Sequence, residues 1–123
     1  MSGKRILVVD DEAITLMILE TCLDDWGYEV IGVAMSADQA ISMAIEQRPN
    51  LILMDITLKG DKDGIEATHT IKAIFEVPVI FVTAHVDHKT IARAEGTPPP
   101  SYILNKPFRD ADLKQMVEMA LVQ

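Results

Sequence analysis

The sequence predicts a three-layer α/β fold in which five helices cover both faces of a five-stranded parallel sheet. Short apolar runs alternate with longer segments of helical periodicity, the pattern of repeated βαβ units. No hairpin turn signal joins two neighbouring apolar runs. A chain of 123 residues has room for one compact domain, and five such units favour the doubly wound strand order 2-1-3-4-5.

Five apolar runs predict the five strands. The third run, Leu51 to Met54, is the most informative because it lies between a Pro49-Asn50 turn signal and an acid, Asp55. Four consecutive large apolar residues indicate a strand that is buried on both faces. The predicted strands cover residues 6–9, 29–34, 51–54, 79–82 and 102–105.

Helical periodicity separates these runs. The first helix, about residues 12–25, follows three acids, which favour a helix N-terminus, and Gly27 ends it. Ser36 and Gln39 have capping-box spacing at the start of the second helix, and Pro49 follows its end. We expect a broad buried face on the first helix, made by Ile14, Leu16, Met17, Ile18, Leu19, Cys22 and Leu23.

Three more helices are predicted over about residues 64–75, 86–94 and 113–121. The helix over 86–94 has a thin apolar face, and Pro98 stops the chain from continuing it. We therefore expect it to be the least securely packed element. No linker composition marks a second domain, so residues 1–123 are expected to form a single domain without an output domain.

Composition narrows the classes of partner. The formal net charge is −8 and the 11 basic residues are scattered, which argues against a nucleic-acid or anionic membrane surface and favours protein partners. The single cysteine, Cys22, cannot form an internal disulfide. No signal peptide or membrane-spanning segment is predicted. The expected location is the cytoplasm.

Polar residues at four predicted strand ends should share one pocket. Asp10 and Asp11 follow the first strand, Asp55 the third, Thr83 the fourth and Lys106 the fifth. Open parallel sheets bind ligands beyond the carboxyl ends of their strands, where the winding direction reverses. Three close carboxylates repel one another strongly unless a cation lies among them or one is protonated, and oxygen ligands suit Mg²⁺. With a hydroxyl and an ammonium nearby, this chemistry suits phosphoryl transfer to the central acid, Asp55.

Four motifs in this order resemble the receiver domain of bacterial two-component response regulators, a chemotaxis-regulator-like, flavodoxin-like domain. They are Val9-Asp10-Asp11-Glu12, Leu53-Met54-Asp55, Val82-Thr83-Ala84 and Lys106-Pro107-Phe108. The resemblance covers essentially the whole chain. It implies a signalling domain that is not a conventional enzyme: Asp55 would take a phosphoryl group from a histidine kinase or phosphotransfer protein, with self-catalysed uptake and slow autodephosphorylation.

The resemblance also implies a ligand set for the metal. Asp11 and Asp55 would bind Mg²⁺ directly, Asp10 would bind it through water, and the Thr57 backbone carbonyl would be a further ligand. We hypothesise that the Thr57 side chain and His85, each two residues beyond a motif residue, set the lifetime of the phosphorylated state.

Other implied roles lie on the fourth and fifth strands. Thr83 and Lys106 would contact the phosphoryl oxygens, and the Lys106-Pro107 peptide would be cis. Thr83 would also act in the conformational switch, whose aromatic residue belongs three positions before Lys106, where this chain has Ile103. Tyr102 lies one position further and could take that role only if a bulge absorbed an extra residue.

The switch is expected to alter the face made by the helix over 86–94, the fifth strand and the last helix. That face would contact a downstream protein target, and it is also a possible homodimer surface.

Two other functions fit parts of the sequence. A docking module could keep the receiver fold without using phosphorylation, and the displaced aromatic supports that interpretation. A Mg²⁺-dependent phosphohydrolase could also form an aspartyl phosphate. Such enzymes carry Asp-x-Asp after the first strand, however, whereas Asp10 and Asp11 are adjacent, and no segment here forms a cap over a substrate.

Overall fold

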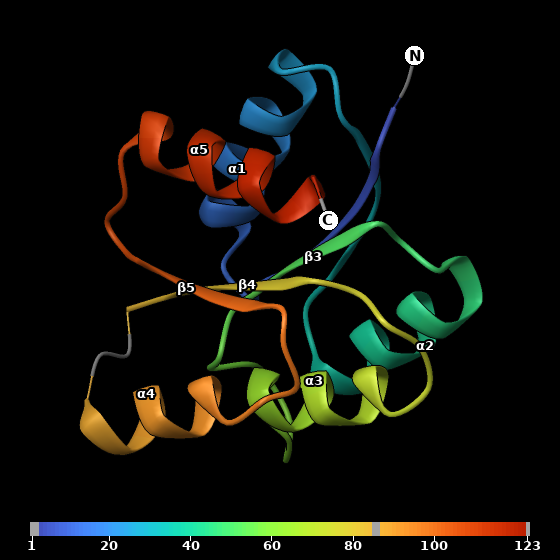
Figure 1. Ribbon diagram of the computed structural model, residues 1–123, viewed down its shortest axis with the longest axis vertical. Coiled ribbons are helices and arrows are strands. Elements are labelled where there is room, and N and C mark those ends of the chain that lie inside the picture. Colours follow the sequence, from blue (N-terminus) through green and yellow to red (C-terminus); the bar gives the residue numbers. More distant parts are fainter. Residues whose placement is uncertain (1–2, 85–86, 123) are drawn as a thin grey trace.

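The computed structural model describes residues 3–84 and 87–122. Its centre is a parallel sheet with the strand order β2-β1-β3-β4-β5 (Figure 1). Both the architecture and the strand order confirm the prediction, and no strand boundary differs from its predicted place by more than one residue. The strands are β1 Arg5–Val9, β2 Glu29–Ala34, β3 Leu51–Met54, β4 Val79–Thr83 and β5 Ser101–Asn105.

Helices cover both faces of the sheet, with α1 and α5 on one face and α2, α3 and α4 on the other (Figure 1). No helix within the described ranges is long and apolar enough to cross a membrane. The helices are α1 Ala13–Asp25, α2 Ala37–Gln47, α3 Gly64–Lys72, α4 His88–Glu95 and α5 Asp110–Leu121.

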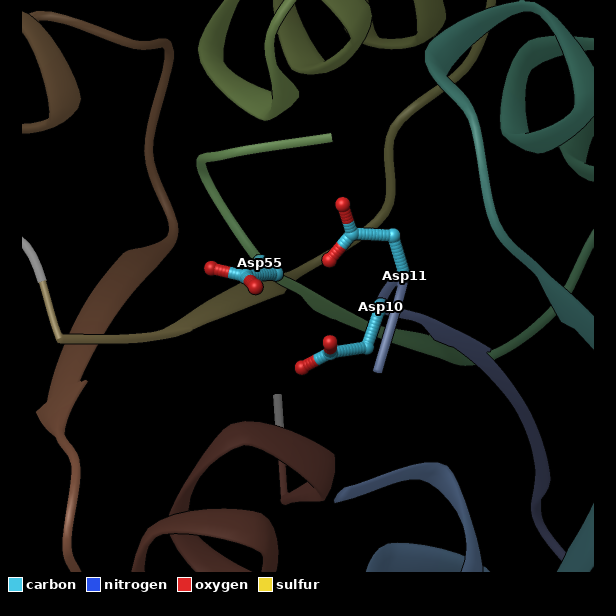
Figure 2. A group of neighbouring side chains, drawn as sticks. All are labelled: Asp10, Asp11 and Asp55. Atoms are coloured by element: carbon cyan, nitrogen blue, oxygen red, sulfur yellow. The ribbon is translucent and has the colours of Figure 1, made fainter. Parts of the chain in front are cut away.

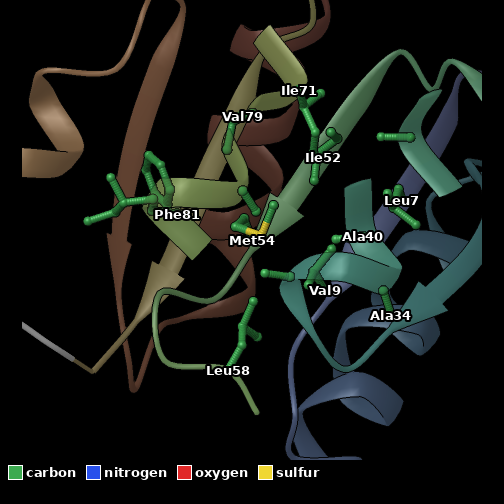
Figure 3. Packing of buried hydrophobic residues seen from close by; sticks show 14 of the residues in the cluster. Leu7, Val9, Ala34, Ala40, Ile52, Met54, Leu58, Ile71, Val79 and Phe81 are labelled. Carbon is green, nitrogen blue, oxygen red and sulfur yellow. The ribbon is translucent and has the colours of Figure 1, made fainter. Parts of the chain in front are cut away.

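Strand β3 is the rigid centre of the molecule. Ile52 and Met54 point into the cluster beneath α2 and α3 (Figure 3), while Leu51 and Leu53 point into the opposite cluster beneath α1 and α5. All four side chains are fully buried, as expected for the central strand of a parallel sheet. Because each burial contributes about 1.5–3 kcal/mol, the strand holds the following residue, Asp55, in a fixed place.

The predicted cap of α2 is present. The Ser36 side chain accepts a hydrogen bond from the Gln39 amide at 3.2 Å, and the Gln39 side chain accepts one from the Met35 amide at 2.8 Å. Arg48 ends the helix in the left-handed conformation, with φ of 49°, and Pro49 follows it. These local bonds satisfy backbone groups that a helix end leaves unpaired.

Helix α3 ends at Lys72, three residues earlier than predicted. Phe75 lies outside the helix and packs beneath the Arg48 guanidinium, which is 4.6 Å from the ring centroid. Ile74, inside the predicted helix, also lies beyond its observed end and is 47% exposed. The chain leaves the helix early because it must turn back toward Pro78, where β4 approaches.

The predicted buried face of α1 was too broad. Leu16, Leu19 and Leu23 form a single buried stripe at spacings of three and four residues, and Cys22 is half-buried at its edge. The other predicted core residues are exposed: Ile14 at 74%, Met17 at 65% and Ile18 at 46%. A helix lying on a sheet buries one stripe, so apolar residues elsewhere on its circumference remain at the surface.

Helix α4 is the lightly packed element that the sequence predicted. Ala94 is its one buried residue, and the helix begins at His88, with the Asp87 side chain accepting a hydrogen bond from the Thr90 amide at 2.9 Å. The predicted first residue, Val86, lies outside the described residues, as does His85. An ion pair of 2.9 Å between Arg93 and Asp63 ties α4 to the start of α3.

Candidate functional site

The ends of β1 and β3 place Asp10 and Asp55 side by side. The Asp10 amide donates a hydrogen bond to the Ala34 carbonyl at 3.0 Å, and the Asp55 amide donates one to the Val9 carbonyl at 2.8 Å. Parallel pairing therefore continues one residue past each strand. Figure 2 shows the carboxylates of Asp10, Asp11 and Asp55 gathered at this edge of the sheet.

These three acids form a candidate metal centre. One carboxylate oxygen from each lies within 4.8 Å of the others. Asp10 and Asp55 are buried, at 0% and 6% exposure, and Asp11 is half-buried at the opening. A donor set made only of oxygen suits a hard cation such as Mg²⁺, so the residues present fit the predicted ion.

Lys106 supplies the positive charge of the site. Its Nζ lies 2.8 Å from Asp10 Oδ2, 3.3 Å from Asp55 Oδ2 and 3.4 Å from Glu12 Oε1. The Lys106 amide donates a hydrogen bond to the Thr83 carbonyl at 2.9 Å, and the Lys106–Pro107 peptide is cis. The ammonium group therefore joins the ends of β1 and β3.

Glu12 is a member of the site that the sequence interpretation missed. It was taken as an acid that favours the start of α1, but its carboxylate reaches Lys106. Its amide also donates to Asp10 Oδ1 at 2.9 Å. The one signal in the sequence is its position in the Asp10-Asp11-Glu12 run, and only the fold brings Lys106 to that run.

Burial and charge shift the pKa values here. Burial, followed by the charge of Asp10, raises the pKa of Asp55, although Lys106 and the Ile56 amide partly oppose this. That amide donates to Asp55 Oδ1 at 2.7 Å. Burial disfavours the Lys106 ammonium, but hydrogen bonding to Asp10 and the charges of Asp55 and Asp10 outweigh it and raise the pKa of Lys106. The metal-free site thus carries unbalanced negative charge.

A pocket of about 400 Å³ opens directly onto the Asp55 carboxylate. Such a volume corresponds to roughly a dozen water molecules, enough for a hydrated ion and a phosphoryl group. Because polar side chains line most of it, a charged ligand can enter. The lining residues are Asp11, Glu12, Asp55, Thr57, Ala84 and Lys106.

The two threonines singled out from the sequence have different surroundings. Thr57 is exposed and lines the pocket. Thr83 is fully buried at the end of β4, directly before the pocket residue Ala84. His85, the other predicted modulating residue, lies outside the described residues, so its place relative to the pocket stays a prediction.

The pairing of β4 with β5 shows whether a bulge could bring Tyr102 to the predicted switch position. Phe81 pairs with Ile103 and Thr83 pairs with Asn105, without a register shift. The bulge that Tyr102 would need is absent. Ile103 packs against the same cluster as Phe81, whereas Tyr102 packs against the opposite one. Ile103, an aliphatic residue, therefore keeps the position three residues before Lys106, where the family resemblance leads us to expect the switch aromatic.

The fold and the acidic site define the class of protein. Residues 6–118 match the family model of the response regulator receiver domain, and the chain belongs to this family. Its members are signalling proteins of two-component systems, for which phosphorylation and magnesium are typical.

Several known proteins are similar to this chain. It is 37% identical to the phyllosphere-induced regulator PhyR of Methylorubrum extorquens, over 97% of this chain and 44% of that protein. It is 31% identical to the transcriptional regulatory protein PdtaR of Mycobacterium tuberculosis, over 96% of this chain and 57% of that protein. The chain therefore spans about half the length of these relatives.

A solved structure is similar along almost its whole length. It is the CheY-like response regulator receiver domain protein from Methanospirillum hungatei JF-1, which superposes with a TM-score of 0.88 at 30% identity. The match covers 98% of this chain and 95% of that one. The flavodoxin-like fold class predicted from the sequence is thereby confirmed.

Proposed function

We propose that this chain is a phosphorylation switch in which Asp55 accepts a phosphoryl group from a histidine kinase or phosphotransfer protein. The observation that carries the proposal is the arrangement at the ends of β1 and β3. One carboxylate oxygen from each of three acids lies within 4.8 Å of the others. The Lys106 ammonium contacts Asp10 and Asp55, and a pocket opens on Asp55. An acid that can act as a nucleophile, beside groups able to stabilise charge on a transferring phosphoryl group, supports this function.

The transfer forms one bond and breaks another. A carboxylate oxygen of Asp55 attacks phosphorus, and the bond from phosphorus to the donor imidazole nitrogen breaks. The imidazole leaves with the electron pair of that bond and later takes up a proton. The Nζ atom of Lys106 lies 3.3 Å from Asp55 Oδ2. Lys106 and Thr83 would then donate hydrogen bonds to the phosphoryl oxygens.

Mg²⁺ is the cofactor that these residues would hold. Asp11 and Asp55 would be direct ligands, Asp10 would act through water, and the Thr57 carbonyl would be a further ligand. Bound there, the ion would neutralise carboxylate and phosphoryl charge together. The donor set of oxygens alone supports this assignment.

The surface around the pocket favours a protein as the donor. Ile14, Met17 and Ile18 on α1 are exposed, and Ile18 also lines a second pocket that shares Ala84 and Lys106 with the acceptor pocket. Exposed apolar residues beside a reactive site are typical of a protein contact surface. A donor protein that reached Asp55 would cover them.

The signal would leave through the face made by α4, β5 and α5. Thr83 is followed closely by α4, which has one buried residue, so a change at Thr83 meets little resistance there. We propose that a downstream protein binds this face in the phosphorylated state, and that a second copy of the chain could also use it.

The test is incubation of the protein with Mg²⁺ and a small acyl phosphate, followed by intact-mass measurement. We expect the protein to gain the mass of one phosphoryl group and lose it slowly. Asp55→Asn should gain nothing, while Asp24→Asn, which neutralises an exposed acid on α1, should behave as the wild type. Hydrogen exchange of the phosphorylated sample should then change most in α4, β5 and α5.

A second function, a docking module independent of phosphorylation, is favoured by Ile103 at the switch position. In that case the wild type gains no mass in the same assay. A phosphohydrolase would instead consume many equivalents of acyl phosphate rapidly. Each of these results would refute the proposed switch.

A further inference from the structure

Gly64, the first residue of α3, lies against the backbone of the acceptor residue. A Cβ atom at this position would lie 1.9 Å from the carbonyl oxygen of Asp55, and 2.9 Å from both its carbonyl carbon and Met54 Cγ. Real Cβ atoms essentially never approach other atoms closer than 3.0 Å. The positive-φ glycines in the described residues are Gly27 and Gly60, so Gly64 is required for space rather than for an unusual backbone conformation.

The peptide touched by Gly64 also holds the reactive carboxylate. The carbonyl of Asp55 and the amide of Ile56 belong to one planar unit, and that amide donates to Asp55 Oδ1 at 2.7 Å. The Gly64 amide donates to the next carbonyl along the chain, that of Ile56, at 2.7 Å. The start of α3 therefore contacts both peptides that connect Asp55 to the loop carrying Thr57.

Neither Gly64 nor the Asp55–Ile56 peptide can move away from this contact easily, because both are held by other interactions. The Gly64 carbonyl accepts a hydrogen bond from the buried Thr68 hydroxyl at 2.8 Å. The preceding residue, Asp63, forms a reciprocal capping box with Glu66, with both bonds at 2.9 Å. On the other side, β3 is buried on both faces and the Asp55 amide is paired with Val9.

We propose that Gly64 is a positioning residue for phosphoryl acceptance, because the absence of its side chain lets α3 set the Asp55–Ile56 peptide and, through it, the direction of the Asp55 carboxylate. This inference rests on the proposed function. A methyl group at position 64 would have to displace the Asp55 carbonyl by about 1 Å to reach an allowed contact, and a misplacement of about 1 Å can lower a reaction rate by roughly 10²-fold.

The experiment compares Gly64→Ala with Gly96→Ala in the full chain. At exposed Gly96, the residue that caps the C-terminus of α4, a Cβ would lie an ordinary 3.4 Å from its nearest neighbours, so this variant controls for the loss of a glycine. The folded fraction is measured from the fluorescence of Trp26. Mg²⁺ affinity is measured by titration calorimetry without a phosphodonor, and the phosphorylation rate is measured with acyl phosphate.

For folded Gly64→Ala we expect weaker Mg²⁺ binding and a phosphorylation rate lower by about 10²-fold, with both values unchanged in Gly96→Ala. A purely structural role would reduce the folded fraction and leave both values of the folded molecules at wild type, which would overturn the proposal. If Gly64→Ala does not fold, Thr68→Val tests the proposal instead, because it removes the hydrogen bond to the Gly64 carbonyl. Weaker Mg²⁺ binding by Thr68→Val would support the proposal, and unchanged binding would refute it.

The two measurements also separate this proposal from the proposed function. If the wild type accepts no phosphoryl group, the proposed function fails. Mg²⁺ affinity would still report whether Gly64 positions the Asp55 carboxylate.

Discussion

Replacing Asp55 by Asn should stabilise the metal-free protein at neutral pH. The change keeps the shape of the side chain but removes one of three negative charges whose oxygens lie within 4.8 Å of one another. Lys106 remains paired with Asp10 at 2.8 Å. Active-site groups that are arranged to bind a cation often reduce stability when the cation is absent.

The magnitude follows from the distances. At an effective dielectric constant of about 20, two charges at the upper limit of 4.8 Å repel by about 3.5 kcal/mol. Asp55 faces both Asp10 and Asp11, so the repulsion on it is about 7 kcal/mol in total. The attraction between Asp55 Oδ2 and Lys106 Nζ at 3.3 Å offsets about 5 kcal/mol of this repulsion. The net repulsion of about 2 kcal/mol corresponds to a rise in Tm of roughly 8 °C for a domain of this size.

The pH dependence has a definite sign. The folded state raises the pKa of Asp55 above its ordinary value of 3.8, so it binds this proton more tightly than the unfolded state. Wild-type stability therefore falls as pH rises from 3.8 through the raised pKa. Asn does not ionise, so the advantage of Asp55→Asn should be full above this window and absent below it.

Thermal unfolding in a chelator and in excess Mg²⁺ measures both effects. Mg²⁺ should raise the Tm of the wild type more than that of Asp55→Asn, because the variant lacks one ligand. A variant that is less stable than the wild type in chelator at neutral pH would refute the electrostatic argument. Equal responses of the two proteins to Mg²⁺ would refute the assignment of Asp55 as a ligand.

Two further predictions concern the same pocket. Thr57→Ala should speed loss of the phosphoryl group by about threefold to tenfold, equivalent to roughly 1 kcal/mol, because the truncation opens the pocket that Thr57 lines to water. His85→Ala tests the other half of the hypothesis in the same assay, and unchanged rates in both variants would remove it. Lys106→Met should destabilise the metal-free protein by about 3 kcal/mol, because it leaves the buried charges of Asp10 and Asp55 unpaired. The contribution of Lys106 to the free energy of unfolding is fully present below its ordinary pKa of 10.5 and is lost as pH rises through the raised pKa. Urea unfolding at pH 8 should therefore show that Lys106→Met is less stable than the wild type, and equal stabilities would contradict this prediction.

The fold and the central acids could be predicted because they depend on local patterns. The apolar run Leu51 to Met54 demands burial on both faces, and strand order then places Asp10 and Asp55 at one edge of the sheet. The β4–β5 pairing was harder, because Tyr102 or Ile103 could occupy the switch position until the register was known. The absence of a bulge decided it.

Other features depend on tertiary contacts that have no sequence period. Ile14, Met17 and Ile18 are as apolar as the leucines of α1, and only the orientation of the helix on the sheet separates exposed from buried residues. Glu12 joins the site because Lys106 arrives from the far end of the chain. The closeness of Gly64 to the acceptor likewise arises from packing, since a glycine at a helix start is ordinary in sequence terms.

The ionic groups around the pocket set an order of arrival for its ligands. Asp10, Asp11, Glu12 and Asp55 supply four acidic groups and Lys106 supplies one basic group, so the protein groups around the pocket attract cations and repel phosphates. An anionic donor that came first would meet this repulsion in full. A divalent cation that came first would cancel most of it, so the proposed function predicts that Mg²⁺ binds before the phosphoryl donor.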